Sequence, residues 1–87
     1  MSYTVQTRNS LKKDVKKIPD KILREIYREI DLLAEDPYRE GVRKVKGSDD
    51  LYRIRVGDYR VLYEIDDKVR NLMIVCIRHR KDAYRGL

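Results

Sequence analysis

Two segments of alternating polarity, residues 51–56 and 59–65, flank the dipeptide Gly57-Asp58, and this pattern leaves few folds open to the chain. A period of two is typical of strands that bury only one face. A glycine and an aspartate between two such segments predict a tight turn, and hence an antiparallel hairpin. The apolar face of that hairpin must be covered by other elements, because a hairpin alone buries too little surface.

Two amphipathic helices upstream are expected to provide the cover. Residues 11–18 predict a short helix that follows Asn9 and Ser10, residue types that favour helix N-caps. Pro19 ends this helix and Asp36-Pro37 ends the next, because the residue before a proline avoids helical geometry. Apolar side chains recur every three or four positions in both helices: Leu11, Val15, Ile18, Ile22, Ile26, Ile30 and Leu33. We therefore expect a helix hairpin with one shared apolar side.

Three further segments complete the predicted sheet. Residues 3–7 predict a first strand, residues 42–46 a short edge strand, and residues 72–77, apolar on both sides, a central strand. The expected order is β-α-α-β-β-β-β. This is an α+β fold with a mostly antiparallel sheet and the N-terminal helix hairpin packed on one face. The length of 87 residues suits a single domain over residues 1–87.

Several classes of protein do not fit the composition. No apolar run approaches the roughly 20 residues that cross a bilayer, and the first residues lack the apolar core of a signal peptide. We therefore expect a cytoplasmic protein with no membrane partner. Cys76 is the only cysteine, so no internal disulfide is possible, and together with His79, the only histidine, it gives too few ligands for a zinc site. We expect no metal and no cofactor.

The charge of the chain is unevenly distributed. The net charge is +6, from 21 basic and 15 acidic residues, and acids gather in residues 20–36. The remainder is correspondingly more basic, which points to one basic functional face. Such a face suits a nucleic acid or an acidic protein. Ordinary solubility would explain the same balance, so charge alone leaves both interpretations open.

Three arginines share one predicted face of the sheet. Arg53, Arg55 and Arg60 alternate with the apolar residues of the two hairpin strands, so they project away from the helices if those residues face them. Like charges side by side destabilise a sheet, which suggests an anionic ligand. Phosphate is the favoured ligand, because arginine binds it with two parallel hydrogen bonds. In the alternative interpretation, the arginines are solvated and pair with nearby acids: Asp49, Asp50 or Glu64.

The basic C-terminal segment, residues 78–87, contains a tyrosine among cations. Neighbouring cations would lower the pKa of Tyr84, because they favour the phenolate, and its ring would stack on an unpaired base. Docking of the segment onto the sheet is the alternative role of this ring. His79 is expected to point to the other face from Arg78 and Arg80, and a lone histidine at a strand end is more often structural. We therefore leave His79 out of the candidate site.

Taken together, several segments resemble the RelE/ParE superfamily of toxins. Residues 51–63, Leu-Tyr-Arg-Ile-Arg-Val-Gly-Asp-Tyr-Arg-Val-Leu-Tyr, resemble its strand-turn-strand signature, and residues 77–84, Ile-Arg-His-Arg-Lys-Asp-Ala-Tyr, resemble its C-terminal motif. Residues 33–37 and 41–47 also resemble that superfamily. The resemblance implies a microbial toxin paired with a small RelB-like antitoxin. RelE-type members cleave messenger RNA in the ribosomal A site, whereas ParE-type members share the fold and act on DNA gyrase.

The resemblance also implies which residues act. The catalytic candidates are Arg53, Arg55, Arg60, Arg80 and Tyr84. Beside them, we expect other basic residues to bind the RNA substrate: Lys44, Lys46, Arg78 and Lys81. Well-studied RelE toxins carry at position 53 a lysine that has been considered a proton acceptor. Arginine stays protonated, so Arg53 stabilises charge but hardly removes a proton. A gyrase inhibitor and a non-catalytic RNA-binding homologue are the alternatives to a metal-independent endoribonuclease.

Overall fold

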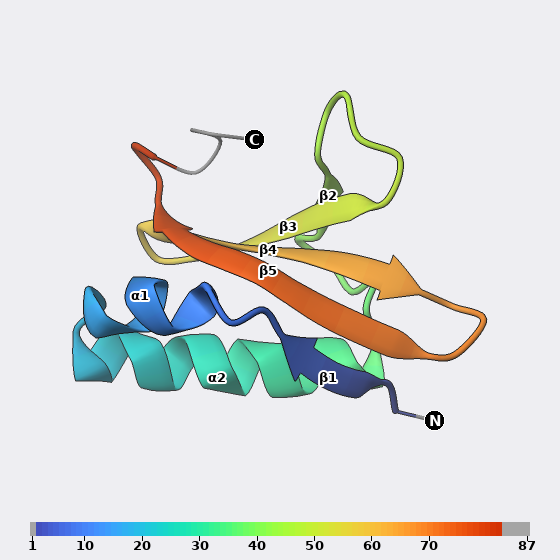
Figure 1. Ribbon diagram of the computed structural model, residues 1–87, viewed down its shortest axis with the longest axis horizontal. Coiled ribbons are helices and arrows are strands. Elements are labelled where there is room, and N and C mark those ends of the chain that lie inside the picture. The colour runs from blue at the N-terminus through green and yellow to red at the C-terminus, as the bar shows by residue number, and fades with distance from the viewer. Residues whose placement is uncertain (1, 83–87) are drawn as a thin grey trace.

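The computed structural model describes residues 2–82. The elements along the chain (Figure 1) are β1 (Thr4–Thr7), α1 (Leu11–Lys16), α2 (Asp20–Glu35), β2 (Arg43–Lys44), β3 (Leu51–Val56), β4 (Tyr59–Asp66) and β5 (Asn71–His79). The predicted order of elements and the α+β class are confirmed. β2 is shorter than the predicted strand over residues 42–46, because Gly41 and Gly47 turn the chain on either side of it with φ values of 96° and 85°.

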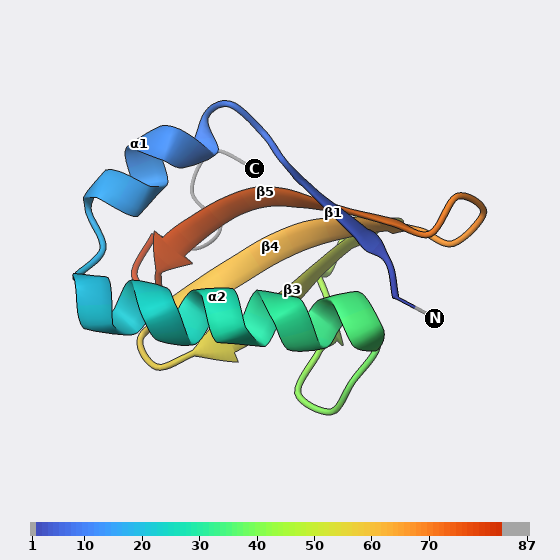
Figure 2. The ribbon, with the colours of Figure 1, turned by 90° about the horizontal axis from the view of Figure 1, so that it is seen from below.

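The strands form one five-stranded sheet in the order β1-β5-β4-β3-β2. β1 runs parallel to β5, and the other neighbouring strands are antiparallel. Both helices lie on one side of this sheet (Figure 2), as the helix hairpin predicted. Neither helix in the described part of the chain is long and apolar enough to span a membrane. The other face of the sheet carries no described helix (Figure 2).

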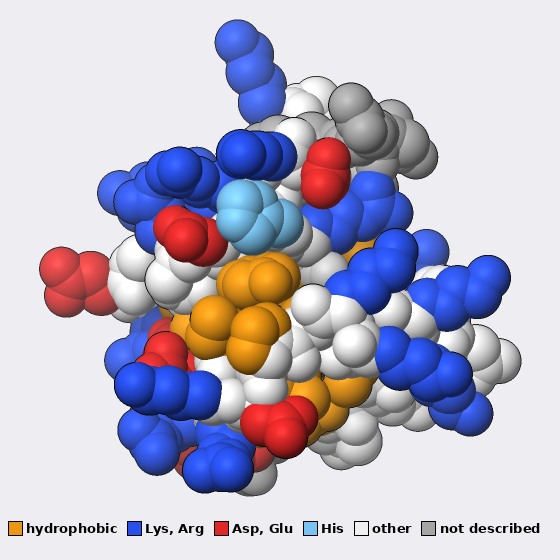
Figure 3. Space-filling view, turned by 90° about the vertical axis from the view of Figure 1, so that its left-hand side faces the viewer, with side chains coloured by type: hydrophobic (Ala, Val, Ile, Leu, Met, Phe, Trp, Pro, Cys, Tyr) orange, Lys and Arg blue, Asp and Glu red, His pale blue; other side chains and the backbone are white. Residues whose placement is uncertain are grey.

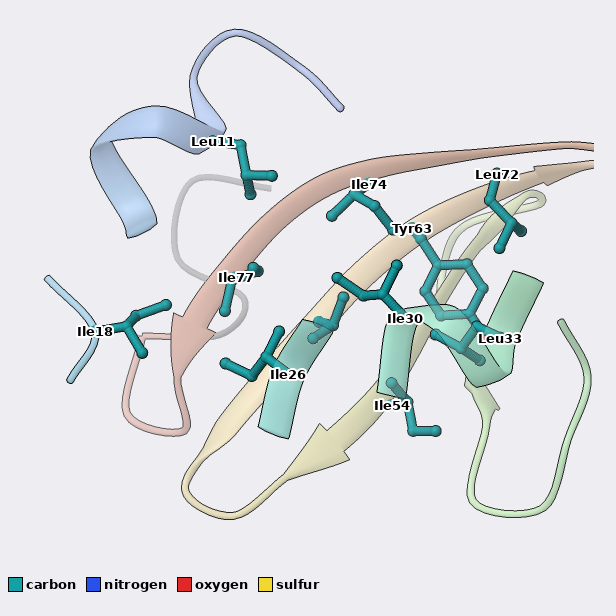
Figure 4. Close-up of a cluster of buried hydrophobic side chains, with 11 residues drawn as sticks. Leu11, Ile18, Ile26, Ile30, Leu33, Ile54, Tyr63, Leu72, Ile74 and Ile77 are labelled. Atoms are coloured by element: carbon teal, nitrogen blue, oxygen red, sulfur yellow. The ribbon is translucent and has the colours of Figure 1, made fainter. Parts of the chain in front are cut away.

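The main hydrophobic core fills the space between the helices and the sheet (Figure 4). Ile26 and Leu33 of α2 are fully buried, and each such side chain stabilises the fold by about 1.5–3 kcal/mol. Tyr63 is also fully buried, and its hydroxyl donates a hydrogen bond to the carbonyl of Pro37 at 2.8 Å. The buried phenol is therefore satisfied, as buried polar groups generally are. The core fixes which side of each strand faces the helices.

A β-bulge in β5 reverses which side chains face the helices. Leu62 pairs with Cys76 but the next residue of β4, Tyr63, pairs with Ile74, so Val75 is an extra residue in β5. Val75 and Cys76 both pack in a cluster separate from the main core, whereas Ile74 belongs to the main core. In a regular strand, Arg78 would share the helix-facing side with Ile74. The bulge places it on the opposite face.

Candidate functional site

Three arginines lie in register on three adjacent strands. Arg55 of β3 pairs with Arg60 of β4, and Arg60 pairs with Arg78 of β5. Residues directly opposite each other in neighbouring strands project from the same face, with Cβ atoms about 4.5–5.5 Å apart. We call these three residues the arginine row. The row lies on the face away from the helices, because the residues flanking Arg60 on β4, Tyr59 and Val61, pack in the main core.

A second cross-strand row lies beside the first. Arg43 of β2 pairs with Arg53 of β3, which in turn pairs with Leu62 of β4. Leu62 is fully buried in a second hydrophobic cluster on this open face, together with Val45, Val75 and Cys76. The arginines therefore border an apolar floor. Burial raises the pKa of the Cys76 thiol, so this sulfur stays protonated and does not act as a nucleophile.

A pocket of about 440 Å³ brings four arginines together. It is lined by Arg43, Arg53, Arg55 and Arg60, with Glu29, Glu40, Gly41 and Ile54 completing the wall. Glu29 forms an ion pair with Arg39, so its carboxylate is already engaged. We call this site the arginine pocket. Sequence reasoning missed Arg43, because nothing in a two-residue strand indicates its register with β3.

Arg60, which lines this pocket, has an unsatisfied donor. Its Nη1 atom is buried and has no hydrogen-bond partner among the described residues. Glu64, which could have neutralised an arginine here, forms its ion pair with Arg8 at 3.2 Å instead. Within residues 2–82, no ion pair joins Asp49 or Asp50 to these arginines. A buried unsatisfied donor destabilises a fold by about 1–3 kcal/mol, and an anion bound by this guanidinium would relieve that cost.

The lysine candidates lie next to the arginine pocket. Lys44 and Lys46 are exposed and line a hollow of about 600 Å³ with Val45, Leu51 and Arg53 among its other walls. Arg53 lines both this hollow and the arginine pocket, so the two are neighbours. The shared wall brings Lys44, Lys46 and the arginines of the pocket close together at this edge of the sheet, and such a group of cations suits a polyanion.

The candidates after β5 are only partly described. The backbone N–H of Arg80 donates to the carbonyl of Asp58 at 2.7 Å, so the segment following β5 is fixed to the β3–β4 turn. The side chains of Arg80 and Lys81 are exposed, and neither lines the arginine pocket. Tyr84 lies outside the described residues, so its predicted role stays a prediction.

His79 points to the opposite side of the sheet from Arg78. Its ring contacts the ring of its ladder partner Tyr59 edge to face, with centroids 5.4 Å apart, and Tyr59 packs in the main core. Basic side chains gather around the histidine at this end of the molecule (Figure 3). His79 does not line the arginine pocket, and charge stabilisation is the chemistry that the four arginines of the pocket can supply.

Comparisons with known proteins agree with this fold. Residues 2–84 match the family described as ParE toxin of type II toxin–antitoxin system, parDE. The toxin RelG of Mycobacterium tuberculosis strain H37Rv is 33% identical over 98% of this chain and 99% of its own length. The crystal structure of an archaeal RelE–RelB complex from Pyrococcus horikoshii OT3 superposes with a TM-score of 0.80 at 33% identity, covering 95% of this chain and 100% of the other.

A second solved structure gives the same result. The toxin–antitoxin complex RelBE2 of Mycobacterium tuberculosis superposes with a TM-score of 0.81 at 28% identity, and covers 92% of this chain and 100% of the other. In each of these comparisons the matched protein is covered almost from end to end.

Proposed function

Because this chain belongs to the RelE/ParE superfamily of toxins from type II toxin–antitoxin systems, we propose that it is a RelE-type endoribonuclease that cleaves messenger RNA in the ribosomal A site. The observation that supports this most is the buried, unpartnered Nη1 atom of Arg60 in a pocket lined by four arginines. Such a pocket suits one phosphodiester, since guanidinium groups bind phosphate oxygens in pairs.

The proposed reaction is attack of an RNA 2′-hydroxyl on the adjacent phosphate. A bond forms between the 2′-oxygen and phosphorus, and the bond from phosphorus to the 5′-oxygen breaks. The products are a 2′,3′-cyclic phosphate and a free 5′-hydroxyl. DNA lacks the nucleophile and is not cut. Arg55 and Arg60 hold the phosphate and neutralise the charge that grows in its transition state, Arg53 adds to that field, and Arg80 supports the leaving oxygen. Tyr84 orients the base or accepts the proton.

Ribosome dependence follows from what the pocket lacks. The four arginines of the pocket do not release protons near neutral pH, so they contribute no general base catalysis. Positioning of the messenger by the ribosome would compensate, since correct orientation alone supplies a large part of many rate enhancements. We therefore expect negligible cleavage of free RNA.

The proposed partner in the cell is a RelB-like antitoxin. Two of the matched structures are complexes of RelE-type toxins with their antitoxins. An acidic antitoxin segment that covered the arginine pocket would satisfy the same donors as the substrate phosphate and so block the site. Lys44, Lys46, Arg78 and Lys81 are proposed to bind messenger RNA. A cytoplasmic location follows from a ribosomal target.

Primer extension on messenger from cells that express the chain tests the proposal. We expect cuts in frame with the codons, and their loss in Arg60→Ala and Arg80→Ala. Arg24→Ala is the matched control, because Arg24 is exposed on α2, on the far side of the sheet. A gyrase inhibitor would still arrest growth with either of these two substitutions, and a non-catalytic RNA-binding homologue would leave the messenger intact. Either result contradicts the proposal.

A further inference from the structure

Three hydrogen bonds hold the turn that follows β5. The N–H of Asp82 donates to the carbonyl of His79 at 2.8 Å, which closes a four-residue turn. The N–H of Lys81 donates to the Nδ1 atom of His79 at 3.3 Å. The N–H of Arg80, between these two donors, donates to the carbonyl of Asp58 at 2.7 Å. His79 thus accepts two of the three bonds, one of them through its side chain.

The imidazole acts here as an aspartate or asparagine acts in an Asx turn. An acceptor atom bonded to the γ-carbon accepts a hydrogen bond from the N–H of the residue two positions further along the chain, and this bond stabilises the turn locally. Nδ1 can accept only when it carries no proton, so the bond selects the neutral ring with its hydrogen on Nε2.

The ring of His79 is itself held in place. It contacts Tyr59 edge to face, and it lines a hollow of about 450 Å³ between the sheet and the end of α1, with Asp14, Lys17 and Ile18 opposite. The side chain is half-buried, so few rotamers are open to it. The ring is therefore held where Nδ1 can accept the N–H of Lys81.

The 79–82 turn also fixes the position of the Arg80 backbone. The carbonyl of Asp58 belongs to the β3–β4 turn, and the residues that flank this turn include Arg55 and Arg60, which pair with each other. The N–H of Arg80 is bound to that turn, so the backbone from which its guanidinium extends has a defined place beside the arginine row. His79 reaches Arg80 only through the backbone, since its ring lies on the other side of the sheet.

We propose that His79 is a positioning residue, whose neutral imidazole holds the 79–82 turn and thereby aims Arg80 at the scissile phosphate. This inference rests on the proposed function, in which Arg80 supports the leaving oxygen. Displacement of a catalytic group by about 1 Å can lower a rate about a hundredfold, so a loosened turn is costly even if the fold is intact.

Three variants at position 79 distinguish the role of the hydrogen-bond acceptor Nδ1 from the role of the aromatic ring. Asparagine carries an oxygen on its γ-carbon where histidine carries Nδ1, whereas glutamine carries its oxygen one bond further out and alanine carries none. We expect His79→Asn to cleave ribosome-bound messenger with a kcat within about threefold of the wild type. We expect His79→Ala and His79→Gln to lose at least tenfold in kcat with little change in KM, because Arg80 acts on the transition state.

A double variant tests whether His79 acts through Arg80. In an Arg80→Ala background, His79→Ala should cause no further loss of kcat, since the group that it positions is already gone. Additive losses, or equal rates for the asparagine, glutamine and alanine variants, would overturn the proposal. Thermal unfolding of each variant checks that the fold is retained.

A second readout does not depend on activity. The amide hydrogen of Lys81 should exchange slowly in the wild type and in His79→Asn, and faster in His79→Ala and His79→Gln. Fast exchange of this amide in the wild type would overturn the role of His79 in the turn. If the wild type cleaves no messenger at all, the proposed function fails, and the exchange of the Lys81 amide still decides whether His79 holds the turn.

Discussion

At the scale of single residues, Arg60 combines a structural cost with a functional use. Its Nη1 atom is buried without a partner, and its neighbours across the ladder, Arg55 and Arg78, carry the same charge. Both features oppose folding, the first through an unsatisfied donor and the second through repulsion. Strain of this kind is common where a site is built for a ligand rather than for stability.

Arg60→Met should therefore separate activity from stability. Methionine keeps the apolar stem and removes the guanidinium, so we expect a hundred- to a thousandfold loss of messenger cleavage on ribosomes. The free energy of unfolding should rise by about 1 kcal/mol, because an unsatisfied donor is removed. Urea denaturation and single-turnover cleavage measure the two effects. A parallel loss of stability and activity would show that Arg60 is mainly structural.

Arg53 allows a test of proton transfer. Because a lysine ammonium can release its proton when it is desolvated and an arginine cannot, Arg53→Lys adds a group that can serve as a base beside the pocket. We expect kcat on ribosomes to rise by at least about tenfold, and to gain a limb that increases with pH. Arg43→Lys, in the neighbouring position of β2, is the matched control. Equal pH profiles for the wild type and Arg53→Lys would limit position 53 to charge stabilisation.

At the scale of elements, the face on which the hairpin arginines lie can be predicted from the sequence, whereas the register of β5 cannot. Alternation along β3 and β4 predicts that Arg53, Arg55 and Arg60 share a face, because a hairpin fixes the pairing of its own strands. The bulge at Val75 has no such signal, since the centre of β5 is apolar on both sides. The sequence therefore does not predict on which face of the sheet Arg78 lies, and the pairing of β5 with β4 shows it.

Asp14 of α1 supports β5 beyond the end of β1. The ladder between these two strands ends at Thr7 and Ile74, and further along β5 the N–H of Ile77 donates to the carboxylate of Asp14 at 3.1 Å. The helix thus satisfies a backbone donor of a strand that has lost its neighbour on that edge. This contact also anchors β5 just before His79.

Replacement of Asp14 tests this contact. We expect Asp14→Ala to lower the free energy of unfolding by about 1–3 kcal/mol, because a partly buried backbone donor loses its acceptor. Asp14→Asn keeps an acceptor oxygen and should lose less than half as much. Urea denaturation at neutral pH gives both values. Equal stability of the alanine variant and the wild type would mean that water replaces the carboxylate.

At the scale of the whole molecule, one carboxylate joins three distant segments. Asp67, in the β4–β5 turn, accepts hydrogen bonds from the hydroxyls of Tyr3 at 2.6 Å and Tyr38 at 2.7 Å. Tyr3 precedes β1 and Tyr38 follows α2. The ring of Tyr38 meets that of Tyr52 edge to face, and Tyr52 stacks on Tyr63 in the core. We call Asp67, Tyr3 and Tyr38 the clasp. It holds together the end of the sheet furthest from the 79–82 turn.

The clasp predicts how stability depends on pH. The hydrogen bonds from Tyr3 and Tyr38 lower the pKa of Asp67, because both donate to the ionised carboxylate. The folded state therefore holds this proton more weakly than the unfolded chain, whose aspartate pKa is about 3.9. The contribution to stability is fully present above that value and is lost as the pH falls through the lower pKa of the folded state.

The double variant Tyr3→Phe/Tyr38→Phe should remove this dependence. It keeps both rings but donates no hydrogen bond, so the pKa of Asp67 should return toward its ordinary value. We expect the wild type to be the more stable of the two at pH 6, and the difference in free energy of unfolding to shrink steadily below about pH 4. Urea denaturation across this range measures the difference. A gap that stayed constant down to pH 2 would mean that the hydroxyls stabilise the fold without their bonds to the ionised carboxylate.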